Sequence, residues 1–238
     1  MKNEMTKAQN TELTVAQDLD AWGDTGVTAS DMVIPKALLM QGLSEAVADG
    51  NAAIGDYLNS LTGEVIAKKG EELELIPFHM DKYWAISEKS GNKFRRVEAA
   101  TPANENLPWD FTDEDGVDCK RTMVRAFYCL KSDELDGFPI IVSFSSTAAK
   151  IGKKLATRMF MMNRQAGKVP CAYGIKLSAA VVKGDKGTYA TPDFTIGAEV
   201  SPETIATCRD WMLSVKAGNT KADTSDTVAA EPKGSSEF

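Results

Sequence analysis

Apolar and polar positions alternate with two different periods along this chain, and the order of the periods predicts its elements. Residues 146–165 have helical spacing, with Ile151 and Leu155 on one face and Ser145 or Ser146 able to cap the start. Five segments alternate with period two and are rich in strand-forming residues, namely 72–87, 123–131, 138–144, 171–182 and 188–196. The predicted order is three strands, one helix and two strands.

Further elements are expected around this core. A last helix is capped by Ser201, has Pro202 at its first position and ends before Gly218. Residues 101–118 contain two prolines and six acids without a base, which predicts a long exposed loop. Short extended pieces are expected at residues 33–41, 56–59, 64–66 and 94–97.

The order of strands and helix is that of an OB-fold, a five-stranded barrel with its helix between strands three and four. Other α+β folds share this order. We therefore expect a β-rich α+β fold, with an OB-like five-stranded barrel, an inserted helix, extra N-terminal strands and a C-terminal helix. The polar ends of the chain predict three parts: a flexible arm at 1–31, an OB-like domain that binds single-stranded DNA at 32–217, and a disordered tail at 218–238.

The charge distribution changes the picture that the net charge suggests. The whole chain carries a formal charge of −7, which argues against a nucleic-acid partner. However, residues 145–186 hold nine lysines and arginines against one acid, while residues 1–31 hold six acids against two lysines. A basic segment can hold phosphates in an acidic protein because the field is local at physiological salt.

Candidate DNA-binding residues come from this basic segment and from strand alternation. Alternation in the strand at 123–131 places Arg125 and Phe127 together, and we expect that face to be the outer one, where an aromatic ring could stack on a base. A Phe packed in the core beside an Arg paired with an acid is the alternative. The full set of candidates is Lys150, Lys153, Lys154 and Arg158 on the predicted helix, Arg125 and Phe127, Lys176, and the cluster Trp84, Arg95 and Arg96.

No spacing in the chain predicts catalysis. Ile151-Gly152-Lys153-Lys154 lacks the first glycine of a phosphate loop and the hydroxyl residue that would hold magnesium. The acidic run at 113–116 lacks the first and last ligands of a calcium loop. The four cysteines are scattered and the only histidine is His79, so no zinc spacing exists. We expect no enzyme, no metal and no cofactor.

The last residues predict a site for a partner protein. The tail ends in Glu237 and Phe238, after several acids. An acidic tail ending in an aromatic resembles the docking tails of single-stranded-DNA-binding proteins. An ordinary disordered end, or residues left by cloning, is the alternative interpretation.

Two stretches near the start carry a family resemblance. They are residues 34–41, Ile-Pro-Lys-Ala-Leu-Leu-Met-Gln, and residues 55–65, Gly-Asp-Tyr-Leu-Asn-Ser-Leu-Thr-Gly-Glu-Val. Over about residues 32–200 the chain resembles a family of single-stranded-DNA-binding proteins of tailed bacteriophages. The resemblance implies an OB-like fold that coats single strands during phage replication, recombination or repair, and it assigns no binding residues.

The expected function is therefore non-enzymatic binding of single-stranded DNA. Alternatives are a single-strand annealing or recombination-mediator protein, a virion structural or assembly protein, and a divergent nuclease. Expected partners are single-stranded DNA, phage or host replication proteins at the tail, and a second copy of the chain, with a dimer favoured. No apolar run approaches the about 20 residues that span a bilayer, and the first ten residues are polar, so we expect a cytoplasmic protein without a membrane partner.

Overall fold

The computed structural model describes residues 33–91, 93–134, 137–166, 169–184, 187–218 and 221–222. The strands are β1 (Val33–Ile34), β2 (Ala37–Leu39), β3 (Tyr57–Asn59), β4 (Val65–Ala67), β5 (Leu73–Glu88), β6 (Phe94–Ala99), β7 (Asp110–Thr112), β8 (Asp118–Lys131), β9 (Ile140–Phe144), β10 (Tyr173–Gly184), β11 (Gly187–Glu199) and β12 (Lys221–Ala222). The helices are α2 (Glu45–Ala48), the 3-10 turn η2 (Ser146–Ala148), α3 (Ala149–Ala166) and α4 (Pro202–Lys216).

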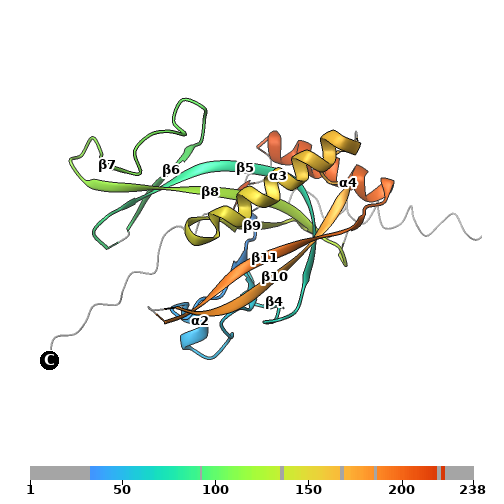
Figure 1. The fold of residues 1–238 in the computed structure, drawn as a ribbon, viewed down its shortest axis with the longest axis horizontal. Helices are drawn as coiled ribbons and strands as arrows, with labels where there is room; N and C mark the ends of the chain where they lie inside the picture. Colours follow the sequence, from blue (N-terminus) through green and yellow to red (C-terminus); the bar gives the residue numbers. More distant parts are fainter. Residues whose placement is uncertain are drawn as a thin grey trace, which may run out of the picture.

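The main sheet follows the predicted order of elements. Its central path is β11–β10–β5–β8–β9, antiparallel at every step, with α3 inserted between β9 and β10 in the chain (Figure 1). The β-rich α+β class is thus confirmed. The predicted closure into a barrel is not seen, because β9 and β11 form no ladder with one another among the described strands.

β5 runs unbroken through Pro77, as the alternation predicted. Pro77 lies opposite Cys129, and the register between β5 and β8 shifts between Pro77 and His79. A bulge of this kind accommodates a residue that has no amide hydrogen for the ladder. β5 and β8 therefore stay paired over almost their entire length.

Both faces of the β5–β8–β9 region are buried. On one face Phe127, Phe144 and Leu155 of α3 share a core with the inner side of β10 and β11. On the other face Tyr128 packs with Cys208 of α4 and with its neighbours on β5 and β9. The sheet is thus sandwiched between α3 and α4, and residues of both alternation sets on β8 belong to a core.

The ends of β5 and β8 extend beyond this sandwich and, with β6 and β7, form a projecting lobe, which we call the distal arm (residues 82–121; Figure 1). A small core of Trp84, Ile86 and Cys119 holds it together. The prediction of a loop at 101–118 is wrong for residues 110–112. These residues form β7, which pairs with the start of β8.

The N-terminal segment joins the two unpaired edges of the main sheet. Lys36 forms a parallel bridge with Ile141 of β9, and the Ile141 amide donates to the Pro35 carbonyl at 2.8 Å. A few residues later the side chain of Gln41 hydrogen-bonds to Ala190 of β11. The segment 35–42 therefore spans the interval that a β9–β11 ladder would otherwise close.

The last helix matches its prediction closely. Ser201 accepts a hydrogen bond from the Thr204 amide, and Pro202 occupies the first turn. Beyond α4, Lys221 and Ala222 pair in parallel with β1, within the region predicted to be a disordered tail. The predicted arm at 1–31 lies outside the described residues. None of the described helices is long and apolar enough to cross a membrane.

Candidate nucleic-acid interface

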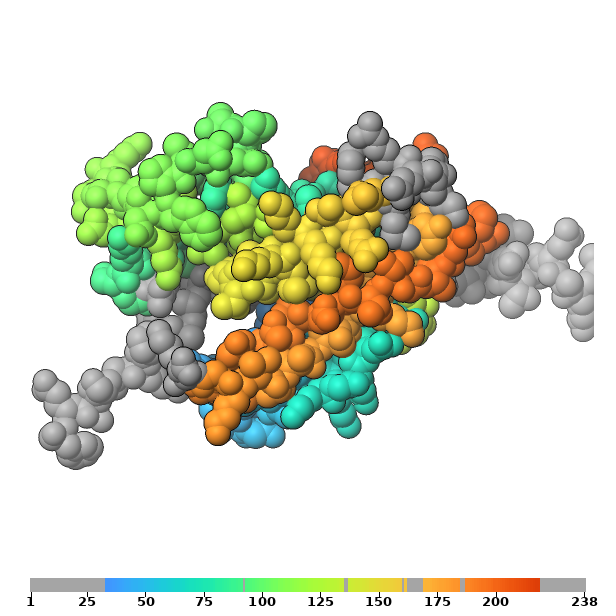
Figure 2. Space-filling model, in the orientation of Figure 1, coloured from blue at the N-terminus to red at the C-terminus, as the bar shows by residue number. Residues whose placement is uncertain are grey.

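Four cations line the exposed face of α3: Lys150, Lys153, Lys154 and Arg158. Leu155 on the opposite face is fully buried in the core. None of the four makes an ion pair with another residue in the described ranges, so their charges are unneutralised within that part of the chain. The predicted placement of these side chains on the solvent face is confirmed, and α3 lies openly across one side of the molecule (Figure 2).

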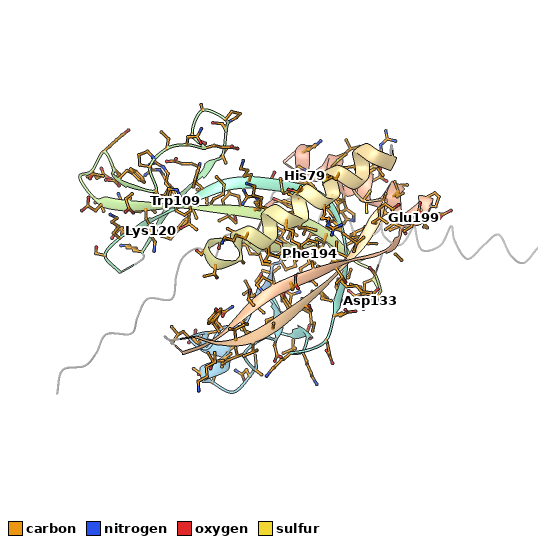
Figure 3. The ribbon with its side chains drawn as sticks, in the orientation of Figure 1. His79, Trp109, Lys120, Asp133, Phe194 and Glu199 are labelled. Atoms are coloured by element: carbon orange, nitrogen blue, oxygen red, sulfur yellow. The ribbon has the colours of Figure 1, made fainter. Side chains whose placement is uncertain are left out.

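Lys154 differs from the other three cations because it also packs. Its Nζ lies 5.7 Å from the centroid of the Phe194 ring on β11, which is a cation–π distance. Phe194 lies where β11 passes α3 (Figure 3). Lys154 therefore fixes α3 to β11 as well as contributing charge.

Gly152 sets how closely α3 approaches the sheet. A Cβ at this position would lie 2.6 Å from the Cβ of Phe144, a distance that side chains do not tolerate. Phe144 is itself fully buried and meets Phe127 edge to face at 5.6 Å between ring centroids. The glycine in the sequence Ile-Gly-Lys-Lys thus serves close helix packing, and this packing holds the cations in place.

Arg125 lies on the same side of the sheet as α3. It is directly opposite Phe144 in the β8–β9 ladder, and residues directly opposite one another share a face. Its side chain is half-buried and makes no ion pair with any other described residue. The structure therefore brings Arg125 to the start of α3, on a face of the sheet that α3 covers.

A cleft of about 1200 Å³ opens beside the start of α3. One wall is the N-terminal segment, a second is β9 with the turn leading into α3, and the third is the end of the β10–β11 hairpin. Its apolar surface includes Leu38, Leu39, Leu43, Ile54, Tyr189 and Pro192, and its rim includes Ser145, Ser146 and Thr147. The cleft occupies the interval between β9 and β11 where the sheet does not close.

Several exposed residues around this cleft were missed by the sequence reasoning. Leu43 is 97% exposed and Tyr189 is 42% exposed, and both line the cleft. Lys183 is exposed next to Gly184, which lines the cleft. Ser146, at the turn before α3, has a φ of 46°, a left-handed conformation that is uncommon outside glycine. No local pattern identifies these residues, because three remote segments form the cleft together.

The prediction that Phe127 lies on an exposed outer face is wrong. Phe127 is 1% exposed and belongs to the core beneath α3. Phe127 and Tyr128 lie on opposite faces of β8, as their alternation predicted, but α4 covers the Tyr128 face as well, so neither face of β8 is open here. Phe127 cannot stack on a base and is withdrawn from the site.

The prediction of a binding cluster around Trp84 is also wrong in its aromatic part. Trp84 is 2% exposed, and its indole Nε1 donates to Asn104 Oδ1 at 3.2 Å. The ring fills the small core of the distal arm. The exposed aromatic of this arm is instead Trp109, at 67% exposure (Figure 3).

Arg95 and Arg96 are engaged with acids of the same arm. Arg95 bonds to Glu88, Asp113 and Asp115, with the shortest distance 2.7 Å to Asp115. Arg96 pairs with Glu98 at 2.8 Å. These two cations therefore stabilise the arm, and we no longer include them in the candidate interface.

Lys176 is likewise paired. Its Nζ lies 3.1 Å from Glu72 and 2.9 Å from Glu74, and hydrogen bonds to these two carboxylates raise the pKa of Lys176. Alternation puts it on the opposite face of β10 from the core residues Ile175 and Leu177. Lys176 thus does not share the surface of α3, contrary to the prediction. Glu237 and Phe238, the predicted partner-binding residues, lie outside the described residues.

Two other groups contain residue types that are often reactive, but their hydrogen bonds and burial give them structural roles here. His79 Nε2 lies 2.9 Å from Asp81 Oδ1, and the Tyr128 hydroxyl donates to Asp81 Oδ2 at 2.8 Å. A hydrogen bond from Cys208 of α4 lowers the pKa of Cys171, yet both thiols are buried. In the described ranges no three His, Cys, Asp or Glu side chains gather as metal ligands would.

Comparison with known proteins gives one family. The model of the Pam3 phage gp34-like protein family matches residues 3–221, which is most of the chain. No curated protein and no solved structure matches.

Proposed function

We propose that this chain, which belongs to the Pam3 phage gp34-like protein family, binds single-stranded DNA without changing it chemically, during phage replication, recombination or repair. The observation that carries the proposal is the exposed row of cations on α3, none paired in the described chain, directly beside an apolar cleft. Phosphates would lie along α3 and Arg125, and unpaired bases would enter the cleft.

The apolar cleft favours single strands over duplex. In a duplex the base faces are stacked on one another, whereas a single strand can turn its bases outward onto apolar and aromatic side chains. Tyr189 provides a half-exposed aromatic ring at the cleft. We propose that it takes the stacking role first expected of Phe127.

The size of the cleft favours an extended ligand. Its volume of about 1200 Å³ exceeds the roughly 300–1,000 Å³ of pockets that enclose small molecules. The start of α3 lies at its rim, and helix amino ends favour phosphate. Lys183 on the hairpin side and Lys150 on the helix side place a cation on either side of the cleft.

The strand order supports an OB-like variant of the fold. An OB-fold is a partly open five-stranded Greek-key barrel that binds oligonucleotides with the sheet of strands two and three and with two of its loops. The path β9–β8–β5–β10–β11 with α3 after β9 has the corresponding order. In this chain the N-terminal segment crosses the interval that closure would occupy and forms one wall of the cleft there.

The direct test is a fluorescence-anisotropy titration of the full-length protein with oligo-dT and with duplex DNA of equal length, at two salt concentrations. We expect preferential binding of oligo-dT that weakens with salt, because binding releases counterions. Equal binding of both, or binding of neither, would refute the proposal. Molecular mass in solution with DNA then distinguishes simple coating from the rings of an annealing or recombination-mediator protein.

A matched pair of variants tests the surface. Lys150, Lys153 and Arg158 are replaced together by Ala, and Lys154 is kept because it packs on Phe194. The control replaces three exposed cations elsewhere, Lys93, Arg209 and Lys216, so that both variants lose the same charge. We expect the first variant alone to lower the magnitude of the salt slope by roughly two units, at about 0.7 for each phosphate contact to a single strand.

A further inference from the structure

Residues 18–24, Asp-Leu-Asp-Ala-Trp-Gly-Asp, combine three carboxylates with an aromatic ring. They precede the first described residue, Val33. In this segment, carboxylates alternate with apolar groups, much as phosphates alternate with bases in single-stranded DNA. The indole ring of Trp22 is flat, like a base. A surface built to take phosphates and bases side by side would also take this segment.

The cleft and α3 provide the complementary surface within the same molecule. The apolar side chains of Leu39, Leu43 and Tyr189 line the cleft. Lys150 and Lys153 are exposed in the first turns of the adjoining helix. Trp22 in the cleft would therefore bring the flanking acids Asp18 to Asp24 alongside unneutralised cations.

The chain is long enough to make this contact. Lys36 lines the cleft and lies 12 steps along the chain from Asp24. At most about 3.3–3.6 Å per residue, this connection can extend about 40 Å. The 18 residues of α3 are about 27 Å long at 1.5 Å per residue, so the connection is longer than the helix that carries the cations.

Two observations favour this segment over the C-terminal tail as the occupant. The family model matches residues 3–221, so it includes Trp22 and ends before Phe238. Residues 1–31 carry six acids against two lysines, a charge of −4, whereas residues 219–238 carry four acids against two lysines, a charge of −2. The N-terminal segment is thus both part of the family's matched region and the more complementary partner of α3.

We propose that residues 18–24 bind the cleft and the α3 cations of their own chain, and that single-stranded DNA must displace them. The inference rests on the proposed function for its consequence, but the intramolecular contact stands without DNA. Because the segment is tethered, its effective concentration at the cleft is high, and weak contacts suffice to hold it there. Competition of this kind would favour long strands, which gain many contacts, over short ones.

The contact is tested without DNA by hydrogen–deuterium exchange of the full-length protein. The variant replaces Asp18, Asp20 and Asp24 by Asn, and a second variant carries Trp22→Ala. The charge-matched control replaces Glu4 and Glu12 by Gln and Asp31 by Asn, acids of the same segment outside residues 18–24. We expect both test variants, and not the control, to exchange faster at residues 36–43 and 145–150. Unchanged exchange at the cleft in both test variants would overturn the proposal.

Oligo-dT titration of the same proteins separates this inference from the proposed function. The Asp-to-Asn variant should bind short oligo-dT roughly threefold to tenfold more tightly than the unaltered protein at low salt, with the difference shrinking at high salt, as expected for a few exposed ion pairs. Faster exchange without any DNA binding would uphold the contact and refute the proposed function. Normal DNA binding with unchanged exchange and unchanged affinity would refute the contact alone.

Discussion

The side-chain amide of Gln41 hydrogen-bonds to the backbone of Ala190 through both its nitrogen and its oxygen. Its Nε2 donates to the Ala190 carbonyl at 3.0 Å, and its Oε1 accepts from the Ala190 amide at 2.9 Å. The side chain thus takes the position of a neighbouring strand at the open edge of β11. Gly42 follows immediately, and a Cβ there would lie 3.1 Å from the Thr188 carbonyl, so the chain passes close to the hairpin.

Removing this amide should loosen one wall of the cleft. We expect Gln41→Ala to destabilise the protein by about 1–3 kcal/mol, because the backbone polar groups of the buried residue Ala190 lose their partner. Gln41→Glu retains the acceptor oxygen and should cost less at a pH where the carboxylate can bond to the Ala190 amide. Urea denaturation measures both. An equal loss in both variants would show that the donor half of the pair alone matters.

The close approach of α3 to β9 leads to a second prediction. In an exposed helix, Gly→Ala stabilises by about 1 kcal/mol. At Gly152 the new methyl would clash with Phe144, so we expect a destabilisation of about 1–3 kcal/mol, as for other overpacked cores. Thr157→Ala on the exposed face of the same helix is the control and should change stability by less than about 0.5 kcal/mol.

A double-mutant cycle identifies Phe144 as the partner in this clash. Phe144→Leu alone should destabilise, since it removes part of a buried ring. When Phe144→Leu is already in place, the cost of Gly152→Ala should shrink, because the two positions share one contact. Strictly additive free energies of unfolding would mean that Gly152 matters for another reason.

Replacing Phe127 and Tyr189 one at a time should separate an effect on folding stability from an effect on DNA affinity. Phe127→Ala is expected to cost about 3–5 kcal/mol of stability, as for a large ring deleted from a core. Tyr189→Ala should leave stability nearly unchanged and cost about 1–3 kcal/mol in oligo-dT affinity, if a base stacks on the ring. Thermal unfolding and titration of both variants provide the comparison. Weakened binding in Phe127→Ala only would contradict the proposed cleft.

The sequence predicted most elements because their signals are local. Alternation, the Ser201 cap and the change to helical spacing are each visible within a few residues. The solvent face of α3 was predictable for the same reason, since Leu155 marks the opposite side. The distal arm was recognised in part: its strand at 94–97 was expected, while β7 was hidden in an acidic, proline-containing stretch.

Burial was not predictable wherever it depends on distant segments. Alternation on β8 assigns Phe127 and Tyr128 to opposite faces, but only the packing of α4, some eighty residues later, shows that both faces are covered. Lys176 could not be known to face Glu72 and Glu74 before the β10–β5 register was known. The cleft is the extreme case, because its three walls come from the beginning, middle and end of the domain.

The bonds of Asp81 predict a pH dependence of stability. A hydrogen bond with His79, together with one from the Tyr128 hydroxyl, lowers the pKa of Asp81 despite its partial burial. A carboxyl whose pKa is lower in the folded state stabilises the fold above its unfolded pKa, and this contribution is lost as pH falls through the folded pKa. Asp81→Asn should therefore lose stability at neutral pH, and this loss should shrink as the pH falls below the unfolded pKa of about 3.9 toward the lowered folded pKa.

Urea denaturation at several pH values tests this difference. Asp210→Asn, an exposed acid on α4 with no bonded partner in the described chain, is the matched control. It should show nearly the same free energy of unfolding as the wild type at every pH. A constant difference between Asp81→Asn and the wild type from pH 7 down to pH 3 would mean that shape, and not charge, explains the role of Asp81.

Lys221 and Ala222 pair with β1, so a truncation that tests the tail must follow Ala222 and leave this strand intact. Residues 223–238 carry little apolar surface, and their acids can compete with DNA for the α3 cations only weakly. We expect deletion of residues 223–238 to leave stability unchanged and oligo-dT affinity unchanged or slightly raised at low salt.

Phe238 and Glu237 should matter only to a partner protein. In a pull-down from phage-infected cells, Phe238→Ala in the full chain should lose a replication or recombination protein that the unaltered chain retains, because the aromatic end is the apolar anchor of the tail. Truncation before Lys221 provides the contrast, since it also removes the pairing with Val33 and Ile34 and should lower stability. Loss of DNA binding on deletion of residues 223–238 alone, with folding intact, would instead place the tail inside the DNA interface.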